Sequence, residues 1–168
     1  MTDSVLITIR QLLAERGVAF REKVHPPTYT SAEAAAARGE ALEVGAKALL
    51  LKTDEMFRLF VMPANRRLES AAIKRELRLK KIRFASAEEL YELTGLVPGS
   101  VPPFGSPILP FDLYADDFVG VTSGRVAFNA GSLTNSIIMS AADWDTVARP
   151  KRFSFARATA PQSTTEEH

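Results

Sequence analysis

Leu96-Val-Pro-Gly-Ser-Val-Pro-Pro-Phe-Gly105 is the stretch of the sequence that constrains the fold most strongly. Its three prolines and two glycines exclude a helix interior and suit a central strand poorly. Glycine allows close backbone approaches that side chains forbid, whereas proline stiffens the chain and removes its own N–H group. The remaining N–H groups of such a loop point in set directions, which suits binding of an oxyanion or a phosphate ester. The same composition is also typical of a buried turn that only connects two elements.

Helix and strand patterns alternate irregularly on both sides of this loop. Apolar spacing, capping residues and terminal glycines predict helices over residues 5–16, 30–39, 67–79, 86–93 and 141–147. Two of them open with the capping-box sequences Thr30-Ser-Ala-Glu33 and Ser86-Ala-Glu-Glu89. Strands are predicted over residues 18–24, 45–53, 57–62, 107–113, 118–122, 125–128 and 136–139. We therefore predict an α+β or mixed α/β fold.

Composition indicates one domain without cysteine chemistry. The chain has 168 residues, of which 46% are hydrophobic and 24% charged, and this suffices for one hydrophobic core. We place the domain at residues 1–157 and expect the polar tail at 158–168 to be disordered. Because there is no cysteine, disulfides, thiolate metal sites and cysteine nucleophiles are excluded. The N-terminus does not resemble a signal peptide and no apolar run could span a membrane, so we expect a cytoplasmic protein.

Positive charge is concentrated in residues 66–83, which we call the basic stretch. This stretch has eight basic and two acidic residues, whereas the whole chain carries a net charge of only +1. Its basic residues are Arg66, Arg67, Lys74, Arg75, Arg78, Lys80, Lys81 and Arg83. Such a concentration could orient an anionic partner, or it could be a solvent-exposed helix face.

Lys47 is the charged residue with the most unusual surroundings in the sequence. In the apolar run Ala46-Lys-Ala-Leu-Leu-Leu51, strand alternation places it on one face with Leu49 and Leu51, and Lys52 on the other face. If the leucines point inward, Lys47 points into the core or a pocket, where an unpaired lysine is costly unless it has a function. The alternative is a lysine at a strand edge whose ammonium group reaches solvent.

Several kinds of active site are disfavoured by the residues present. The body of the chain has a single histidine, His25, and no Gly-x-Ser-x-Gly motif, so a Ser-His-Asp triad is disfavoured. One histidine without cysteine argues against a zinc site, and Asp112, Asp116 and Asp117 fit an acidic turn better than a cation cage. Neither a Walker A loop nor a Gly-x-Gly-x-x-Gly motif is present. We therefore expect no metal and no cofactor.

Four segments of the chain resemble one known family. They are Val24-His-Pro-Pro-Thr-Tyr-Thr-Ser-Ala-Glu-Ala-Ala35, Gly45-Ala-Lys-Ala-Leu-Leu-Leu-Lys52, Thr94-Gly-Leu-Val-Pro-Gly-Ser-Val-Pro-Pro-Phe-Gly105 and Phe128-Asn-Ala-Gly-Ser-Leu-Thr-Asn-Ser-Ile137. The second places Lys47 in a strand, and the third contains a Gly-x-x-x-Pro pattern at Gly99 and Pro103. In these motifs and in their spacing, over roughly residues 4–150, the chain resembles the YbaK/prolyl-tRNA synthetase editing-domain family.

The resemblance implies a single domain with a curved mixed β-sheet flanked by helices, and hydrolysis of mischarged aminoacyl-tRNA as its activity. It implies no metal and no covalent nucleophile, and participation of the 2′-hydroxyl of the terminal adenosine. Lys47 would hold the acceptor end, and backbone donors at Gly99 and Ser100 would stabilise the oxyanion. The expected substrate-binding residues are His25, Thr30, Ser31, Pro103, Asn129, Gly131 and Ser132. From their charge, the residues expected to bind tRNA are Arg66, Arg67, Lys74, Arg75 and Arg78.

One departure from the family concerns specificity. Several alanine-specific members carry histidine in the late strand, where this chain has Phe128-Asn129-Ala130. A small or hydroxyl-bearing amino acid fits the small or polar residues Thr30, Ser31, Asn129 and Ser132. The residues leave open which amino acid is removed and from which tRNA.

Three classes of function remain. The first is a monomeric trans-editing deacylase, whose partners are the acceptor end of aminoacyl-tRNA and an aminoacyl-tRNA synthetase. The second is a non-catalytic binding module for aminoacyl-tRNA, an adenosine-ended RNA or a nucleotide. The third is an enzyme that forms a Schiff base through Lys47, although no residue beside that lysine in the sequence would activate it. The presence of both the lysine and the Gly/Pro loop favours the deacylase.

Overall fold

The first capping sequence begins a helix, although in a modified form. In this computed structural model, which describes residues 3–159, α2 (Ser31–Arg38) starts after Thr30, whose hydroxyl accepts from the Glu33 N–H. The Glu33 carboxylate accepts from the N–H of Tyr29 instead of Thr30, so only half of the predicted capping box forms. The helix ends as predicted at Gly39, which adopts the left-handed conformation with a φ of 71°.

Three of the other helices follow their predicted ranges to within two residues, whereas one is shorter than predicted and a short 3-10 turn was not predicted. They are α1 (Asp3–Glu15), α3 (Ser70–Leu77), α4 (Ala87–Thr94), α5 (Ala141–Ala148) and the single 3-10 turn η1 (Leu42–Val44). α4 has the full reciprocal capping box between Ser86 and Glu89. Within residues 3–159, no helix is long and apolar enough to cross a membrane.

The described strands form three sheets, of which the largest is mixed. Its strand order is β5-β2-β3-β6-β9, with antiparallel pairing around β2 and parallel pairing of β6 with β3 and β9. The second sheet, β1-β8-β7, is antiparallel, and β10 pairs with β4 in the third. The strands are β1 (Phe20–Val24), β2 (Ala46–Thr53), β3 (Met56–Pro63), β4 (Arg66–Leu68), β5 (Ile82–Phe84), β6 (Leu113–Asp116), β7 (Arg125–Asn129), β8 (Asn135–Ser140), β9 (Lys151–Phe153) and β10 (Ala156–Ala158). The predicted mixed α/β class is confirmed.

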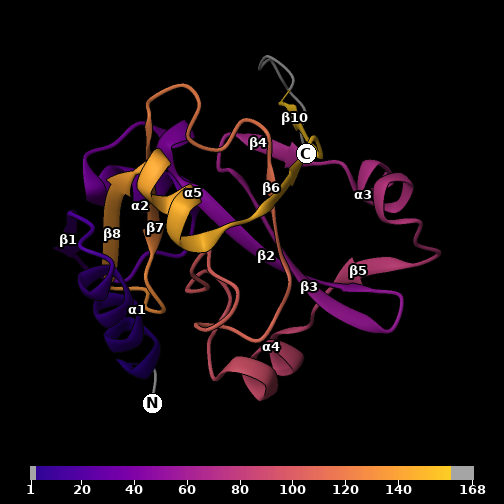
Figure 1. Cartoon of the computed structure of the whole chain (residues 1–168), viewed down its shortest axis with the longest axis horizontal. Helices are drawn as coiled ribbons and strands as arrows, with labels where there is room; N and C mark the ends of the chain where they lie inside the picture. The colour runs from indigo at the N-terminus through magenta and orange to yellow at the C-terminus, as the bar shows by residue number, and fades with distance from the viewer. Residues whose placement is uncertain (1–2, 160–168) are drawn as a thin grey trace.

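The first half of β2 joins the two larger sheets. A parallel bridge between Gly45 and Ala127 brings β7 next to the start of β2. β5 pairs only with the other half of the strand, residues 51–53. Figure 1 shows the result, with α2 and the three-stranded sheet at one end of β2 and with β5 and α3 at the other. The edge of β2 is therefore open between these two ends.

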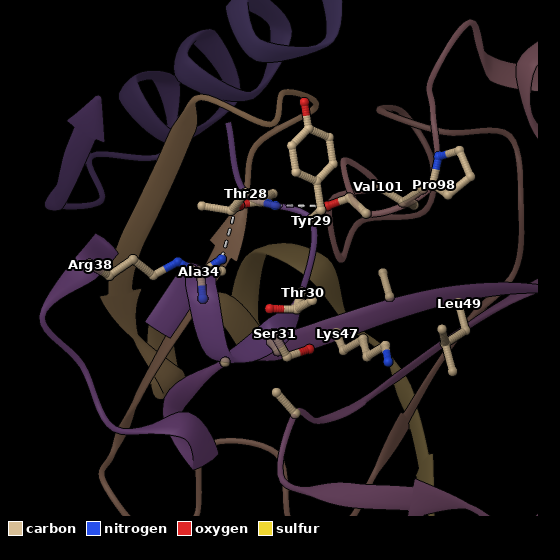
Figure 2. A pocket seen from close by; sticks show the side chains of 16 residues that line it. Thr28, Tyr29, Thr30, Ser31, Ala34, Arg38, Lys47, Leu49, Pro98 and Val101 are labelled. Carbon is tan, nitrogen blue, oxygen red and sulfur yellow. Dashed lines mark hydrogen bonds between the residues drawn. The ribbon is translucent and has the colours of Figure 1, made fainter. Parts of the chain in front are cut away.

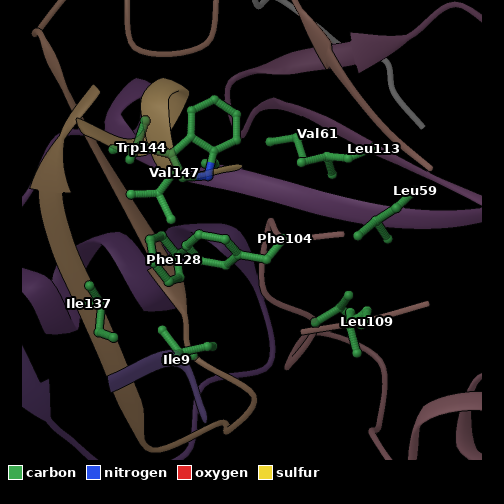
Figure 3. Packing of buried hydrophobic residues seen from close by; sticks show 14 of the residues in the cluster. Ile9, Leu59, Val61, Phe104, Leu109, Leu113, Phe128, Ile137, Trp144 and Val147 are labelled. Atoms are coloured by element: carbon green, nitrogen blue, oxygen red, sulfur yellow. The ribbon is translucent and has the colours of Figure 1, made fainter. Parts of the chain in front are cut away.

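The second half of the Gly/Pro loop is anchored in the main core. Phe104 packs edge to face against Phe128, with 5.5 Å between the ring centroids (Figure 3). The indole N–H of Trp144 on α5 donates to the Pro103 carbonyl at 2.9 Å. Residues 100–105 are buried, whereas residues 97–99 are exposed. The loop is thus both a buried connection and an exposed tip, and both interpretations of its composition apply to part of it.

Several predicted boundaries are wrong. The helix predicted over 67–79 begins only at Ser70, because the preceding residues pair with β10 as β4. Residues 118–122 form turns, and of the strand predicted over 107–113 only Leu113 is in a strand. The apolar residues that suggested these strands, such as Leu109 and Val119, are buried without forming a ladder. In the predicted tail, Ala158 ends β10, and residues 160–168 lie outside the described part of the chain.

Candidate active site

A pocket of about 520 Å³ opens where α2, the start of β2 and the tip of the Gly/Pro loop meet. Figure 2 shows Thr28, Ala34 and Arg38 at one end of it and Lys47 and Leu49 at the other. Thr28 and Arg38 are more than nine-tenths buried, whereas Lys47 is exposed, so the pocket has a buried end and an open end. The full lining is Thr28, Tyr29, Thr30, Ser31, Ala34, Arg38, Gly45, Ala46, Lys47, Ala48, Leu49, Ala64, Pro98, Gly99, Val101 and Asn129.

Lys47 stands at the open end of the pocket. On the same face of β2, Leu51 is buried and Leu49 is half-buried. This face therefore passes from the core at Leu51 into the pocket at Leu49 and Lys47. The Lys47 ammonium group makes no hydrogen bond or ion pair with any residue in the range 3–159. The structure therefore combines the two interpretations of the sequence, because the lysine lines the pocket and also reaches solvent.

Ala48 supplies free backbone groups beside this lysine. The N–H of Ala64 donates to the Gly45 carbonyl at 2.9 Å, so the odd-numbered residues of β2 bond to β3 and the even-numbered ones face the other edge. On that edge, Leu50 accepts from the Ala85 N–H at 2.9 Å, but β5 begins to pair only at residue 51. The N–H and C=O of Ala48 consequently lack a strand partner in the pocket wall.

The part of the Gly/Pro loop that lines the pocket has two unpaired N–H groups. Its prolines have no N–H, and Ser100 donates its own to the Val97 carbonyl at 3.1 Å. Among the described residues, the N–H groups of Gly99 and Val101 have no hydrogen-bond partner, and both residues line the pocket. Backbone N–H groups need a hydrogen-bond acceptor, and a ligand bound in the pocket can supply one. The loop can therefore offer two donors to a negatively charged oxygen.

Arg38 places a buried positive charge in the pocket wall. Its side chain is 7% exposed, and burial lowers the pKa of the guanidinium to about 10 against the opposing field of Glu40. It therefore remains protonated at neutral pH. Nε donates to Ser136 Oγ at 2.9 Å and Nη2 to Asn129 Oδ1 at 3.1 Å. No carboxylate within residues 3–159 forms an ion pair with it, although the charge of Glu40 lies close enough to act on it.

Asn129 connects Arg38 to the Gly/Pro loop. Its Nδ2 donates to the Gly99 carbonyl at 2.8 Å, while its Oδ1 accepts from Arg38 at 3.1 Å. One chain of hydrogen bonds thus runs from α2 through β7 to the loop. Since the Gly99 carbonyl is held, the peptide plane that follows it is held too, and the loop tip keeps one orientation towards the pocket.

His25 supports this chain from behind the pocket. Its Nδ1 lies 2.9 Å from the Pro26 carbonyl, which can only accept, so this nitrogen carries the proton. Its Nε2 lies 2.8 Å from Ser136 Oγ, within hydrogen-bond distance. The Ser136 hydroxyl accepts from Arg38 and donates to Asn129 Oδ1 at 3.1 Å, so the position of each polar group is fixed by the next.

Five of the ten predicted catalytic and substrate-binding residues line the pocket. They are Thr30, Ser31, Lys47, Gly99 and Asn129. They come from α2, β2, the loop and β7, which only the sheet topology brings together. No three Asp, Glu or His side chains of the described chain converge as a metal site.

Three other predicted residues, His25, Ser100 and Pro103, lie outside the pocket lining. His25 is 8% exposed and belongs to the hydrogen-bond chain described above. The Ser100 hydroxyl donates to the Val97 carbonyl and accepts from its N–H, so this residue closes a turn and its predicted oxyanion donor is already used. Pro103 is buried in the core.

The remaining two, Gly131 and Ser132, form the turn between β7 and β8. Gly131 has a φ of +74°, and a Cβ there would approach the side chain of Val5 to 2.8 Å. The Ser132 hydroxyl bonds to Thr134 Oγ1 at 3.0 Å and to Asn135 Oδ1 at 3.1 Å. These contacts shape the turn. None of the five residues belongs to the pocket lining, and their contact with a substrate stays a prediction.

The basic stretch lies apart from the pocket lining. Arg66 and Arg67 are on β4, Lys74 and Arg75 are on α3, and Arg78 follows α3 with a φ of 57°. The Arg66 guanidinium lies 3.9 Å from the centre of the Phe118 ring. The other four side chains are exposed and form no ion pair with a described residue. The stretch therefore forms several charged surfaces instead of one helix face.

Sequence reasoning did not identify the other eleven lining residues, and three of these, Thr28, Arg38 and Val101, bring polar side-chain or backbone groups to the pocket. Arg38 follows Ala34 by four residues and so shares its buried helix face, a pattern that could have identified it. Val101 becomes notable only when the hydrogen-bond partner of every N–H group in the loop is identified, because its own N–H has none among the described residues. Thr28 has no sequence signal, because its burial depends on the fold.

Residues 25–147 match the family described as the aminoacyl-tRNA editing domain. The multifunctional Ser/Thr-tRNA deacylase ProXp-y of Escherichia coli K12 is 32% identical over 151 residues, which cover 87% of this chain and 89% of that protein. The proline–tRNA ligase of Shouchella clausii is 35% identical over 97 residues, or 58% of this chain and 17% of the ligase. A crystal structure described as a candidate trans-editing enzyme for prolyl-tRNA synthetase has the same fold, with a TM-score of 0.78, 24% identity, and coverage of 92% of this chain and 98% of its own.

Proposed function

The chain belongs to the aminoacyl-tRNA editing domain family, and from this premise we propose that it hydrolyses mischarged aminoacyl-tRNA as a freestanding trans-editing deacylase. The observation that carries the proposal is the match to the E. coli deacylase over nearly the whole of both chains. The pocket supports it, since free N–H donors, a fixed loop and an exposed lysine lie in one cavity.

In the proposed reaction, water attacks the ester carbonyl that joins the amino acid to the terminal ribose. The new C–O bond turns the carbonyl oxygen into an oxyanion, which the N–H groups of Gly99 and Val101 stabilise. The ester C–O bond then breaks, the ribose oxygen takes the proton that the attacking water gives up, and free amino acid and tRNA leave. Arg38 adds positive charge to the same wall and, through Asn129, holds the Gly99 carbonyl. Among the residues that line the pocket there is no carboxylate or histidine, which fits assistance by the vicinal hydroxyl of the substrate.

Lys47 holds the acceptor end of the tRNA in this proposal. Its ammonium group has no partner among residues 3–159 and stands at the open end, where the RNA must enter. A flexible point charge suits a phosphate that arrives from solvent. The basic stretch contacts the tRNA backbone farther out, through Arg66, Arg67, Lys74, Arg75 and Arg78.

The amino acid removed is proposed to be small and to carry a hydroxyl group. Thr28, Thr30 and Ser31 bring hydroxyl groups to the pocket. The alanines at 34, 46 and 48 add only methyl groups to its wall. The E. coli relative is named as a Ser/Thr-tRNA deacylase, which agrees with this choice. We further propose that residues 1–157 act as one domain, as a monomer in the cytoplasm, beside an aminoacyl-tRNA synthetase that makes the error.

A deacylation panel tests the proposal. Seryl-, threonyl-, alanyl- and prolyl-tRNA are incubated with the protein, and the loss of the ester is followed over time. We expect seryl- or threonyl-tRNA to be hydrolysed and prolyl-tRNA to survive. A protein that binds a non-hydrolysable aminoacyl-adenosine but leaves every ester intact would be the binding module instead.

A further inference from the structure

Thr28 has a buried hydroxyl that the protein itself leaves without a partner. The residue is 5% exposed, and its Oγ1 has no hydrogen-bond partner among the described residues, although its N–H donates to the Leu133 carbonyl at 3.2 Å. Two other buried side-chain atoms, Arg58 Nε and Asn65 Oδ1, share this property, but neither residue lines the pocket. Buried hydroxyl groups are normally paired, so an unpaired one in a pocket wall points to a ligand.

The position of Thr28 indicates which part of a substrate it meets. It lies at the buried end of the pocket with Ala34 and Arg38 (Figure 2), whereas Lys47 and the 75% exposed Tyr29 mark the side open to solvent. A tRNA is far too large for the buried end and has to remain on the open side. The part of the substrate that reaches Thr28 is therefore the side chain of the amino acid.

The neighbours of Thr28 restrict that side chain further. The guanidinium of Arg38 disfavours a cationic amino acid, and the methyl group of Ala34 adds no polar contact. The other pocket hydroxyl groups are less suited, since Thr30 Oγ1 already accepts from the Glu33 N–H and Ser31 is only half-buried. A substrate hydroxyl can both donate to and accept from Thr28 Oγ1 without bringing a charge into the buried end.

We propose that Thr28 Oγ1 determines specificity by forming a hydrogen bond with the side-chain hydroxyl of seryl or threonyl esters. This inference rests on the proposed deacylase function. A seryl group fills the hydrogen-bonding capacity of Thr28, whereas an alanyl group leaves it unpaired in the complex. A site built to bond a hydroxyl discriminates against the analogue that lacks it, because the buried polar group of the site stays unsatisfied.

The test compares wild type with Thr28→Val, which removes the hydroxyl and keeps the branched shape. Single-turnover deacylation is measured with seryl-tRNA and alanyl-tRNA of the same tRNA sequence. The preference for seryl over alanyl should fall by roughly 10-fold or more, with little loss on alanyl-tRNA. Thr146→Val on the exposed side of α5 is the matched control and should leave the preference unchanged. A preference that is unchanged in Thr28→Val, or an equal loss on both substrates, overturns the inference.

A binding measurement separates this inference from the deacylase proposal. Seryl- and alanyl-adenosine with an amide in place of the ester are titrated into both proteins by calorimetry. Wild type should bind the seryl compound more tightly and Thr28→Val should bind the two alike, whether or not either protein hydrolyses tRNA. Equal affinities in wild type would overturn the role of Thr28 even if deacylation is fast. The free Thr28→Val protein should also melt no lower than wild type, because the lost hydroxyl has no partner within the protein.

Discussion

Arg38 and Lys47 are two cations in one pocket, and the protein holds them in opposite ways. Arg38 is 7% exposed and its donors are engaged by Ser136 and Asn129, whereas Lys47 is exposed and has no partner among residues 3–159. Burying a charge destabilises the folded state by on the order of several kcal/mol, and each hydrogen bond to a charged group stabilises it by roughly 1.5–3 kcal/mol. Arg38 therefore contributes to the order of the site, while Lys47 costs the fold almost nothing and is available to a ligand.

This difference separates the pocket into a fixed side and a free side. The fixed side runs from His25 through Ser136, Arg38 and Asn129 to the Gly99 carbonyl, with each group held by the next. It suits donors that must already point at an oxyanion before the reaction begins. The free side, at Lys47, suits a flexible chain that arrives from solution. Substitutions on the two sides should therefore differ in whether they change rate, stability or salt dependence.

Gly99→Ala on the fixed side should have the largest effect. A Cβ would meet Leu133 Cδ2 at an ordinary 3.5 Å, so space is available, but the φ of +89° is unfavourable for alanine. The peptide should rotate and misdirect its N–H, which lowers turnover by about 100-fold or more while tRNA affinity changes little. Single-turnover deacylation and thermal unfolding are measured on the same preparation. A destabilised but fully active protein would show that the loop tip is scaffolding.

Pro103→Ala is the comparison within the same loop. Its carbonyl, which accepts from Trp144, is retained by alanine, and no donor at the pocket is removed. The rate should therefore fall much less than in Gly99→Ala. A similar loss for both variants would mean that the stiffness of the loop matters more than the direction of its donors.

Lys47→Met should have the next largest effect, on the free side. Loss of one charged contact to the acceptor end should lower kcat/KM by about 10- to 100-fold, with the free energy of unfolding changed by less than about 0.5 kcal/mol. Lys52→Met is the matched control, since Lys52 projects from the other face of β2 and should leave kcat/KM unchanged. Equal rates for wild type and Lys47→Met would remove the clamp role.

Elements with local signals could be predicted from the sequence, and elements that depend on distant partners could not. The caps at Thr30 and Ser86 mark helix starts because the capping bonds lie within one turn. The strands β9 and β10 have three residues each, too few for a periodic pattern, and exist because of β6 and β4. The apolar run at 118–122 suggested a strand, but its residues reach the core from turns.

The site divides in the same way. Lys47 and Gly99 stand out because a lysine in an apolar strand and a glycine in a proline-rich loop are unusual in the sequence itself. Ser100 looked equivalent to Gly99, and only the turn bond to Val97 shows that its N–H is already used. Arg38 and Thr28 become notable only through burial, which for Arg38 depends on β7 and β8.

Arg38→Met should affect stability as well as rate. It leaves the acceptors Ser136 Oγ and Asn129 Oδ1 without their guanidinium donor, which should lower the free energy of unfolding by about 1–3 kcal/mol. Turnover should fall about 10-fold, because Asn129 no longer holds Gly99 firmly. Urea unfolding and deacylation are compared with those of Lys47→Met, which should unfold like wild type. An Arg38→Met protein that is more stable than wild type would show that the charge is retained for function at the expense of the fold.

Replacing Arg75 and Arg78 together by glutamine should have the smallest effect. Both side chains are exposed near the end of α3, outside the pocket lining and without an ion pair to any described residue. If they contact phosphates, tRNA binding weakens several-fold at low salt, and the slope of log K against log salt falls by about 1–2. The preference among amino acids stays the same, because phosphate contacts position the RNA without reading the aminoacyl group. Replacing the exposed Arg16 and Lys23 by glutamine removes the same charge from another face and should leave the slope unchanged. If both double variants change the slope equally, the effect belongs to the net charge of the protein, and the basic stretch is only a solvent-exposed surface.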